Sequence, residues 1–341
     1  MTSVVDRRRF LLTSLAGAAA APLVAKAQPA EKGKVYRIGY IGSEMPTAPA
    51  GQGPFWDRMR ELGWVYGQNV VIEQRVFGAD TSRIQEITRE LISLGTDVFV
   101  VPNGSTAAGV QRVTDTIPIV TTVAGDLVAA GLAASVGRPG GNVTGLQVMQ
   151  TELGGKHLSW LREIVPSLSR VGVLVGDAGF SEAKAPPTHP TAAYIRGIRS
   201  DALSLRLQPQ VVVVAKGDEF AAAFSAFKAQ RTQAIVVYGS NLSSAFRKTV
   251  IALALKHQLP AICIDANWLP DGILMTYGWD REINSRLAAE FVDRILRGAR
   301  AGDIPLQQPT TFRLGINLKT AKALGLAIPP SLLARADQVI E

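Results

Sequence analysis

The feature that most constrains the fold is a regular alternation of short apolar runs with longer amphipathic stretches. The runs are rich in β-branched residues, as in "VYRIGYI" at 35–41, "NVVIEQRVF" at 69–77 and "RVGVLVGD" at 170–177. Between such runs, apolar residues recur at helical spacing, as in "TSRIQEITRELISLG" at 81–95. Strands that alternate with helices are typical of a parallel sheet with helices on both faces.

A glycine-rich stretch, "AASVGRPGGNVTGL" at 133–146, separates two such α/β units of similar size. A chain of 341 residues, 47% of them hydrophobic, is long enough to build both units. The stretch lacks the glycine spacing of a phosphate-binding loop, as does "LGGKH" at 153–157, and it leads into a β-like run. We therefore interpret it as a turn at the edge of a lobe, and we expect two doubly wound parallel sheets.

The first 27 residues are typical of an export signal. Three arginines at 7–9 precede the apolar run "FLLTSLAGAAAAPLVA" and the small residues that end at Ala27. "RRRFLL" fits the twin-arginine pattern, but Asp6 stands where Ser or Thr is usual, so ordinary Sec export is an alternative. A membrane-retained N-terminus is a second alternative, although the run is short for a membrane span. We expect cleavage after Ala27 and a periplasmic protein.

Composition disfavours several classes of function. The leader contains four basic groups and one acid, so the rest of the chain carries about +5 of the total +8, without a basic run that would indicate nucleic-acid binding. A single cysteine, Cys263, excludes an intrachain disulfide, and its apolar surroundings indicate a buried, inert thiol. The three scattered histidines have no metal-ligand spacing, so we expect neither a metal site nor a cofactor.

Several long motifs resemble those of the ABC-transporter substrate-binding family that includes the tryptophan and tyrosine uptake proteins. They are "IPIVTTVAGDLVAAGLAASVGRPGGNVTGL" at 117–146, "RELGWVYGQNVVIE" at 60–73, "GILMTYG" at 272–278 and the block from 291 to 341. The resemblance covers almost the whole chain after the leader. It implies a type I periplasmic binding fold, in which two α/β lobes joined by three crossovers close on a small ligand.

The resemblance also implies the domain boundaries. Residues 28–147 with 276–308 would form the N-terminal lobe, and residues 148–275 with 309–341 the C-terminal lobe. The crossovers would lie near 147–150, just before or within "GILMTYGWD", and near "LQQPTTF". The glycines at 133–146 would then form a tight turn beside this hinge.

Ligands of open parallel sheets bind beyond the carboxyl ends of the strands. The polar residues that follow the expected strands, together with Gln147 at the first crossover, are therefore candidate ligand-binding residues: Ser43, Glu44, Asn103, Ser105, Thr106, Asp126, Gln147, Asp177, Tyr238, Ser240, Asp265 and Tyr277. The helix expected after "PNGST" could hold a carboxylate at its N-terminus, or Ser105 could only cap that helix. Asp126 and Asp265 could bind an ammonium group or cap turns.

We expect a binding protein and not an enzyme. The chain has no G-x-S-x-G motif and no pair of carboxylates at a spacing that would indicate a catalytic site, which disfavours an exported hydrolase. The resemblance implies a monomeric solute-binding component of an ABC importer, which binds a small polar ligand such as an amino acid, aromatic by the resemblance. Its partner would be an ABC permease of the inner membrane with its ATPase. A ligand sensor that presents its closed form to a membrane sensor kinase is the alternative.

Overall fold

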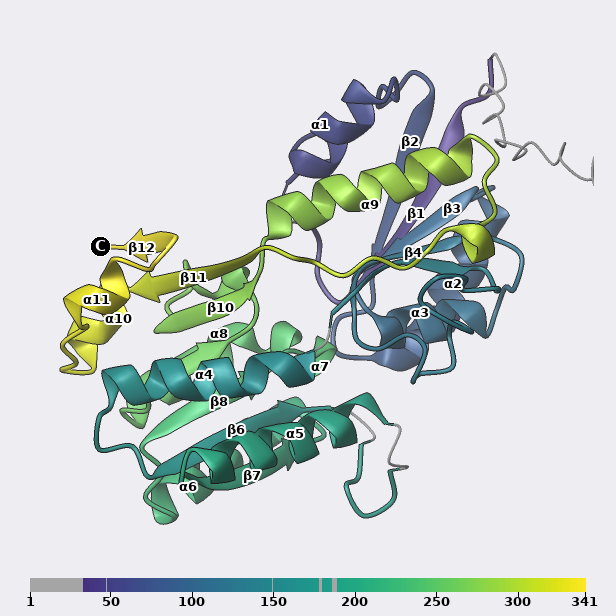
Figure 1. Cartoon of the computed structure of the whole chain (residues 1–341). Helices are drawn as coiled ribbons and strands as arrows, with labels where there is room; N and C mark the ends of the chain where they lie inside the picture. The colour runs from purple at the N-terminus through teal and green to yellow at the C-terminus, as the bar shows by residue number, and fades with distance from the viewer. Residues whose placement is uncertain (1–32, 47, 149, 178–179, 186–188) are drawn as a thin grey trace, which may run out of the picture.

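Two lobes, each built on its own β-sheet, make up the molecule (Figure 1). The computed structural model describes residues 33–46, 48–148, 150–177, 180–185 and 189–341. The export signal predicted at 1–27 lies outside the described residues. Helices cover both faces of each sheet, so the fold class predicted from the alternating pattern is confirmed.

The first lobe contains a parallel sheet with the strand order β2-β1-β3-β4-β5. Its strands are β1 (Tyr36–Gly42), β2 (Val70–Val76), β3 (Val98–Val101), β4 (Ile119–Ala124) and β5 (Val143–Gln147). Its helices are α1 (Pro54–Glu61), α2 (Ile84–Ser93), α3 (Gly104–Gln111) and α9 (Arg281–Leu296), with short 3-10 helices at Thr81–Arg83 and Ala301–Asp303. One face packs on α1 and α9, and the other on α2 and α3.

The second lobe contains a larger sheet with the order β12-β11-β10-β9-β8-β6-β7, in which only the β10–β11 pair is antiparallel. Its strands are β6 (Arg170–Gly176), β7 (Gln208–Val214), β8 (Ala234–Tyr238), β9 (Ala261–Cys263), β10 (Met275–Trp279), β11 (Phe312–Asn317) and β12 (Gln338–Ile340). Its helices are α4 (Gln150–Ile164), α5 (Pro190–Ser204), α6 (Phe220–Ala229), α7 (Asn241–Ala245), α8 (Arg247–Lys256), α10 (Leu318–Ala323) and α11 (Pro330–Leu333), with 3-10 helices at Gly217–Glu219 and Ala266–Trp268.

The chain passes between the lobes at three places. It enters the second lobe after β5, returns after β10, and enters the second lobe again after residues 301–307, which run beside β5. Figure 1 shows α9 lying across the first lobe next to α1, although α9 is made late in the sequence. Its apolar side chains Ala289, Phe291 and Val292 are buried against the first sheet.

The second crossing differs from the predicted domain boundary. The sequence analysis placed residue 276 onward in the N-terminal lobe, but Met275 and Thr276 pair with β9, and β10 pairs along its length with β11. Residues 276–279 therefore lie in the second sheet, and the chain leaves it only at Asp280. The rest of the predicted partition stays a prediction.

The glycine-rich stretch forms a turn, as its spacing predicted. Gly140 has a φ of +80°, a conformation that favours glycine, and its amide donates to the carbonyl of Gly302. A Cβ at Gly302 would lie 2.6 Å from the Gly141 carbonyl oxygen. Glycines on both segments therefore allow the turn to contact the third crossing segment directly.

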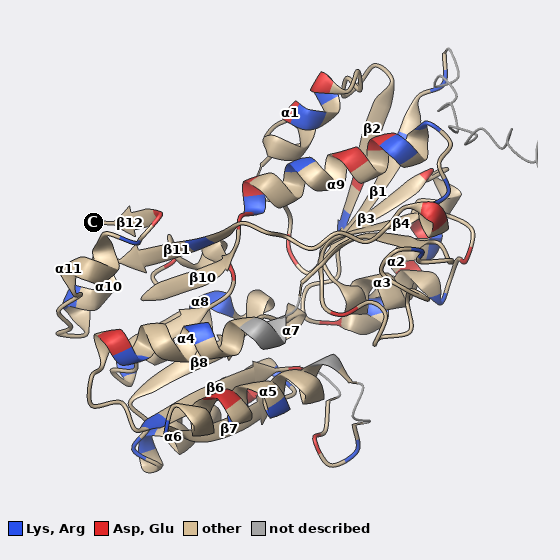
Figure 2. Cartoon of the chain, viewed as in Figure 1, with Lys and Arg blue, Asp and Glu red and all other residues tan. Residues whose placement is uncertain are grey.

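The surface charge is mixed over both lobes. Figure 2 shows basic and acidic residues side by side on α1 and α9 of the first lobe and at one end of α4 in the second. Among the described residues, none of the helices combines the length and the apolar character needed to cross a bilayer.

Candidate functional site

A cavity of about 310 Å³ lies between the two lobes. The first lobe lines it with the loop after β1, the start of α1 and the first turns of α9, and the second lobe with the segments that follow β8 and β9. This is the crevice that parallel strands leave beyond their carboxyl ends. Its volume is typical of a small-molecule site.

Aromatic side chains form much of the wall in the first lobe. Tyr40 comes from β1, and Phe55 and Trp56 come from the first turn of α1, where Pro54 suits the start of a helix. The rings of Phe55 and Trp56 meet edge to face with 5.3 Å between their centroids. Burial raises the pKa of Tyr40 to about 12, although the charge of Arg281 opposes this shift. The Tyr40 hydroxyl therefore keeps its proton and can donate a hydrogen bond.

One face of α9 completes this wall. Asp280 caps the helix by accepting hydrogen bonds from two backbone amides of the first turn, at 2.9 and 3.1 Å. Residues spaced three and four apart then share a face, and four of them line the cavity: Arg281, Asn284, Ser285 and Ala288. Asn284 is only 2% exposed, and neither polar atom of its side chain has a partner among the described residues.

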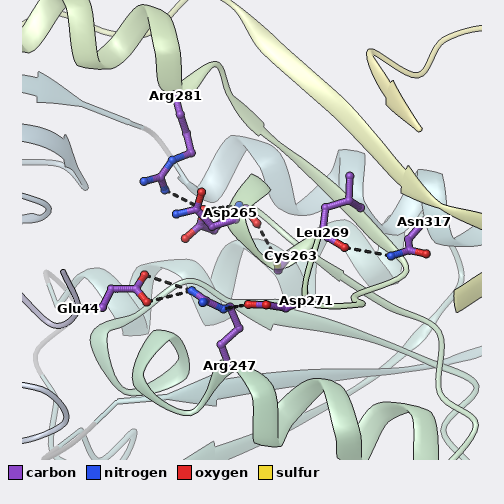
Figure 3. Close-up of polar contacts among 9 residues, drawn as sticks. Glu44, Arg247, Cys263, Asp265, Leu269, Asp271, Arg281 and Asn317 are labelled. Atoms are coloured by element: carbon purple, nitrogen blue, oxygen red, sulfur yellow. Dashed lines mark hydrogen bonds and ion pairs between the residues drawn. The ribbon is translucent and has the colours of Figure 1, made fainter. Parts of the chain in front are cut away.

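The second lobe contributes Asp265, Asn267 and Trp268, among other residues. Asp265 Oδ1 accepts from the backbone amide of Asn267 at 3.0 Å and from Arg281 Nη1 at 2.8 Å (Figure 3). The carboxylate therefore both caps a 3-10 helix and binds the arginine from α9. Burial raises the pKa of the Cys263 thiol, which supports the interpretation of this residue as buried and unreactive.

Polar contacts join the lobes around the cavity. Arg247, at the start of α8, binds Glu44 of the first lobe at 2.9 Å and Asp271 of its own lobe at 2.5 Å (Figure 3). Asn103 Nδ2 donates to Asn241 Oδ1 at 2.6 Å, and Asn241 Nδ2 donates to Ser105 Oγ at 3.2 Å. The two lobes therefore contact each other through side chains of which Glu44, Asn103 and Asn241 line the cavity.

Five of the twelve predicted ligand-binding residues line the cavity. They are Ser43, Glu44, Asn103, Ser240 and Asp265. Each follows or ends a strand of one of the two sheets, as the rule that selected it requires. The structure thus brings together predicted residues that are far apart in the sequence.

Four other candidates lie outside the cavity lining in the first lobe. The amide and hydroxyl of Thr106 donate to Asn103 Oδ1, both at 3.0 Å, and Ser105 Oγ donates to the same atom at 2.8 Å. Asn103, and not Ser105, therefore caps α3 and occupies the helix N-terminus expected to hold a carboxylate. Asp126 closes a turn through two backbone amides, and the buried Gln147 accepts from the amide of Leu127.

The remaining three candidates lie outside the lining in the second lobe. Asp177 accepts a hydrogen bond from Thr191 at 2.5 Å, and burial raises the pKa of its carboxyl. The Tyr238 ring packs on Tyr194, with 4.5 Å between centroids. Tyr277 stacks on Phe312 of β11. These side chains make their contacts within their own lobe and do not line the cavity.

Residues of α1 and α9 were missed by the sequence analysis. These are chiefly Phe55, Trp56, Arg281, Asn284 and Ser285. Three further residues that line the cavity were also missed: Tyr40, Gln52 and Gln74. The rule considered only residues that follow strands, so it passed over helix faces. Among the described residues, no group of histidine, cysteine and carboxylate side chains could hold a metal ion.

Comparisons with known proteins agree with this architecture. A family model described as ABC transporter substrate binding protein matches residues 46–340. A tyrosine-binding protein of Clostridioides difficile is 25% identical over 288 residues, which are 83% of this chain and 79% of that protein.

Solved structures share the fold. An ABC domain from Streptococcus pneumoniae in complex with L-Trp superimposes with a TM-score of 0.75 at 22% identity, and covers 90% of this chain and all of that one. A conserved domain protein from Vibrio cholerae gives the same TM-score and coverage at 23% identity. At these identities the likeness shows the fold alone.

Proposed function

The chain belongs to the ABC transporter substrate-binding protein family, and from this premise we propose that it is the exported solute-binding component of an ABC importer. Proteins of this family bind a substrate and are not enzymes. We infer that a small polar ligand occupies the cavity between the lobes. An aromatic amino acid is the first candidate, because one relative is a tyrosine-binding protein and a similar structure contains L-Trp.

The observation that carries the proposal is a cavity with walls from both lobes, in which aromatic side chains lie among polar and charged ones. Aromatic rings can stack on a flat side chain, while Asp265 and Arg281 offer opposite charges to a zwitterion. A ligand that contacts both lobes stabilises the closed arrangement over the open one. The closed form then docks on a permease of the inner membrane, in the periplasm, after the leader has been removed.

A thermal-shift screen of the chain from Gln28 onward tests this function. A true ligand at one hundred times its Kd stabilises the folded state by about 2.7 kcal/mol, which raises Tm by a few degrees. We expect this rise with at least one of L-Tyr, L-Trp and L-Phe. The Ser285→Trp variant, whose new ring fills the cavity, is expected to lose the rise.

The matched control is Ile283→Trp, on the same helix at an exposed position outside the cavity lining. It is expected to keep the rise in Tm. Equal ligand responses from the two variants would show that the ligand binds elsewhere.

The contact between Arg247 and Glu44 is expected to favour closure. Their side chains are 19% and 39% exposed, and an ion pair of this kind contributes about 1 kcal/mol. Arg247→Ala is therefore expected to weaken ligand binding about fivefold, measured by calorimetry. It should also increase the radius of gyration in small-angle scattering.

Arg199→Ala is the control, because the exposed ion pair of Arg199 with Glu182 lies within one lobe. Its affinity and radius should equal those of the wild type. Unchanged values for Arg247→Ala as well would mean that this contact has no part in closure.

A further inference from the structure

Asn284 has a buried side-chain amide without a hydrogen-bond partner among the described residues. It lies on the cavity face of α9, is 2% exposed, and neither Oδ1 nor Nδ2 forms a hydrogen bond with any described residue. A buried amide without a partner destabilises a fold, so such groups are rare and call for an explanation. Because this amide lines the cavity, a molecule bound there can reach it.

Other buried asparagines of this protein are satisfied within the chain. Asn142 Nδ2 donates to the carbonyls of Thr114 and Ile117 at 3.0 and 2.9 Å. Asn317 Nδ2 donates to the Leu269 carbonyl, and its Oδ1 accepts from the Thr320 amide, both at 3.0 Å. The fold thus has a structural use for amides at those positions. At position 284, in contrast, neither polar atom of the side chain is hydrogen-bonded to a described residue.

The charges nearby indicate what kind of group Asn284 receives. Of the acidic side chains that line the cavity, Glu44 is bound to Arg247 and Asp265 to Arg281. Both carboxylates are thus neutralised by an arginine, whereas the amide of Asn284 has no partner among the described residues. An amide offers one acceptor oxygen and two donor hydrogens, which match an uncharged group that both donates and accepts.

We propose that Asn284 determines ligand specificity, and that it binds an uncharged end of the ligand that carries both a hydrogen-bond donor and an acceptor. The proposal rests on the proposed function, since it requires that the cavity holds a ligand. Such an end is supplied by the ring hydroxyl of an aromatic amino acid or by the amide edge of a neutral ring. A site built around such a group discriminates strongly against an analogue that lacks it, because the buried amide is then left unpaired.

Matched ligand pairs test the proposal. L-Tyr and L-Phe differ by one hydroxyl, and hypoxanthine and purine differ by the cyclic amide edge. We expect the wild type to bind the polar member of at least one pair about tenfold or more tightly than the other member, measured by calorimetry. Asn284→Leu, which keeps the branched shape of the side chain without its polar atoms, is expected to abolish this preference while keeping the apolar member bound. The pair for which the wild type shows this preference identifies the polar group as a ring hydroxyl or as a cyclic amide edge.

The stability of the ligand-free variants gives a second, independent readout. Asn284→Leu removes an unpaired amide, so its Tm is expected to equal or exceed that of the wild type. Asn142→Leu, the matched control, breaks satisfied hydrogen bonds in the same lobe, and its Tm is expected to fall by several degrees. A comparable fall for Asn284→Leu would overturn the proposal, because it would assign Asn284 a structural role.

The outcomes separate this proposal from the proposed function. Equal affinity for the two members of every pair that binds, in both the wild type and Asn284→Leu, would leave the binding function in place and overturn the role of Asn284. If no probe binds, the choice of ligands under the proposed function fails. The stability comparison then still decides whether Asn284 is kept for a ligand or for the fold.

Discussion

Replacing Gly278 with alanine is expected to destabilise the protein by about 3 kcal/mol. Gly278 lies in β10, where a Cβ would be 2.0 Å from the carbonyl oxygen of Ile264 and 3.0 Å from its carbonyl carbon. Backbone atoms cannot rotate out of the way as a side chain can, so β10 would have to move away from the segment that follows β9. Urea denaturation of the purified variant measures the effect.

The displacement should also reach the cavity, because Ile264 and Trp279 both line it. We therefore expect Gly278→Ala to lose ligand affinity as well as stability. Gly137→Ala is the control, since a Cβ there would meet no atom within 4 Å. Its stability is expected to stay within about 1 kcal/mol of the wild type. A Gly278→Ala variant that unfolds at the wild-type urea concentration would contradict the close approach of the two segments.

Acid is expected to destabilise the protein through His157. This side chain is 2% exposed on α4, and burial lowers its pKa from 6.5 to about 4, opposed by its hydrogen bond with the Tyr277 carbonyl at 2.8 Å. The unfolded chain binds a proton near pH 6.5, whereas the folded chain resists protonation until about pH 4. The neutral ring therefore makes its full contribution to the free energy of unfolding above pH 6.5. This free energy falls by about 3 kcal/mol as the pH drops to 4.

Carboxylates also titrate in part of this range, so the test is a difference between variants. His157→Gln cannot gain a proton, and its stability is expected to decline less steeply than that of the wild type between pH 6.5 and 4. His257→Gln is the comparison, because His257 is more exposed and its pKa is lowered less, by burial and by the charges of Lys228 and Lys256, so this variant should change the slope less than His157→Gln does. Parallel curves for the wild type and His157→Gln would contradict the buried, neutral state of this histidine.

Most of the fold could be predicted from local patterns. The apolar run at 170–177 became β6, because a buried strand of a parallel sheet is apolar along its length. The run at 69–77 became the edge strand β2, which is only partly buried and also contains Glu73, Gln74 and Arg75. The position of the second crossing between the lobes was harder to predict from the sequence. Nothing local in "GILMTYGWD" distinguishes a strand of one lobe from the start of the other, because that choice depends on pairing with β9 and β11.

The site was predicted only in part, for a geometric reason. The rule of strand ends located Ser43, Asn103 and Asp265, which lie where their strands stop. Asn284 lies in "REINSRLAAEF", where the sequence does not distinguish it from a solvent-exposed polar residue of an amphipathic helix. Its burial follows from the packing of α9 on α1 and on the first sheet, which are more than 130 residues away in the sequence.

The late position of α9 bears on how the chain folds during synthesis. Domains commonly fold in order as they leave the ribosome, the N-terminal one first. Here one layer of the first lobe, built from α1 and α9, stays incomplete until α9 and the residues after it have been made, by which time β6 to β10 have already been translated. The nascent first sheet therefore presents an apolar face that α1 covers only in part until α9 is made, and neither lobe can be completed as an independent unit before the other is nearly finished.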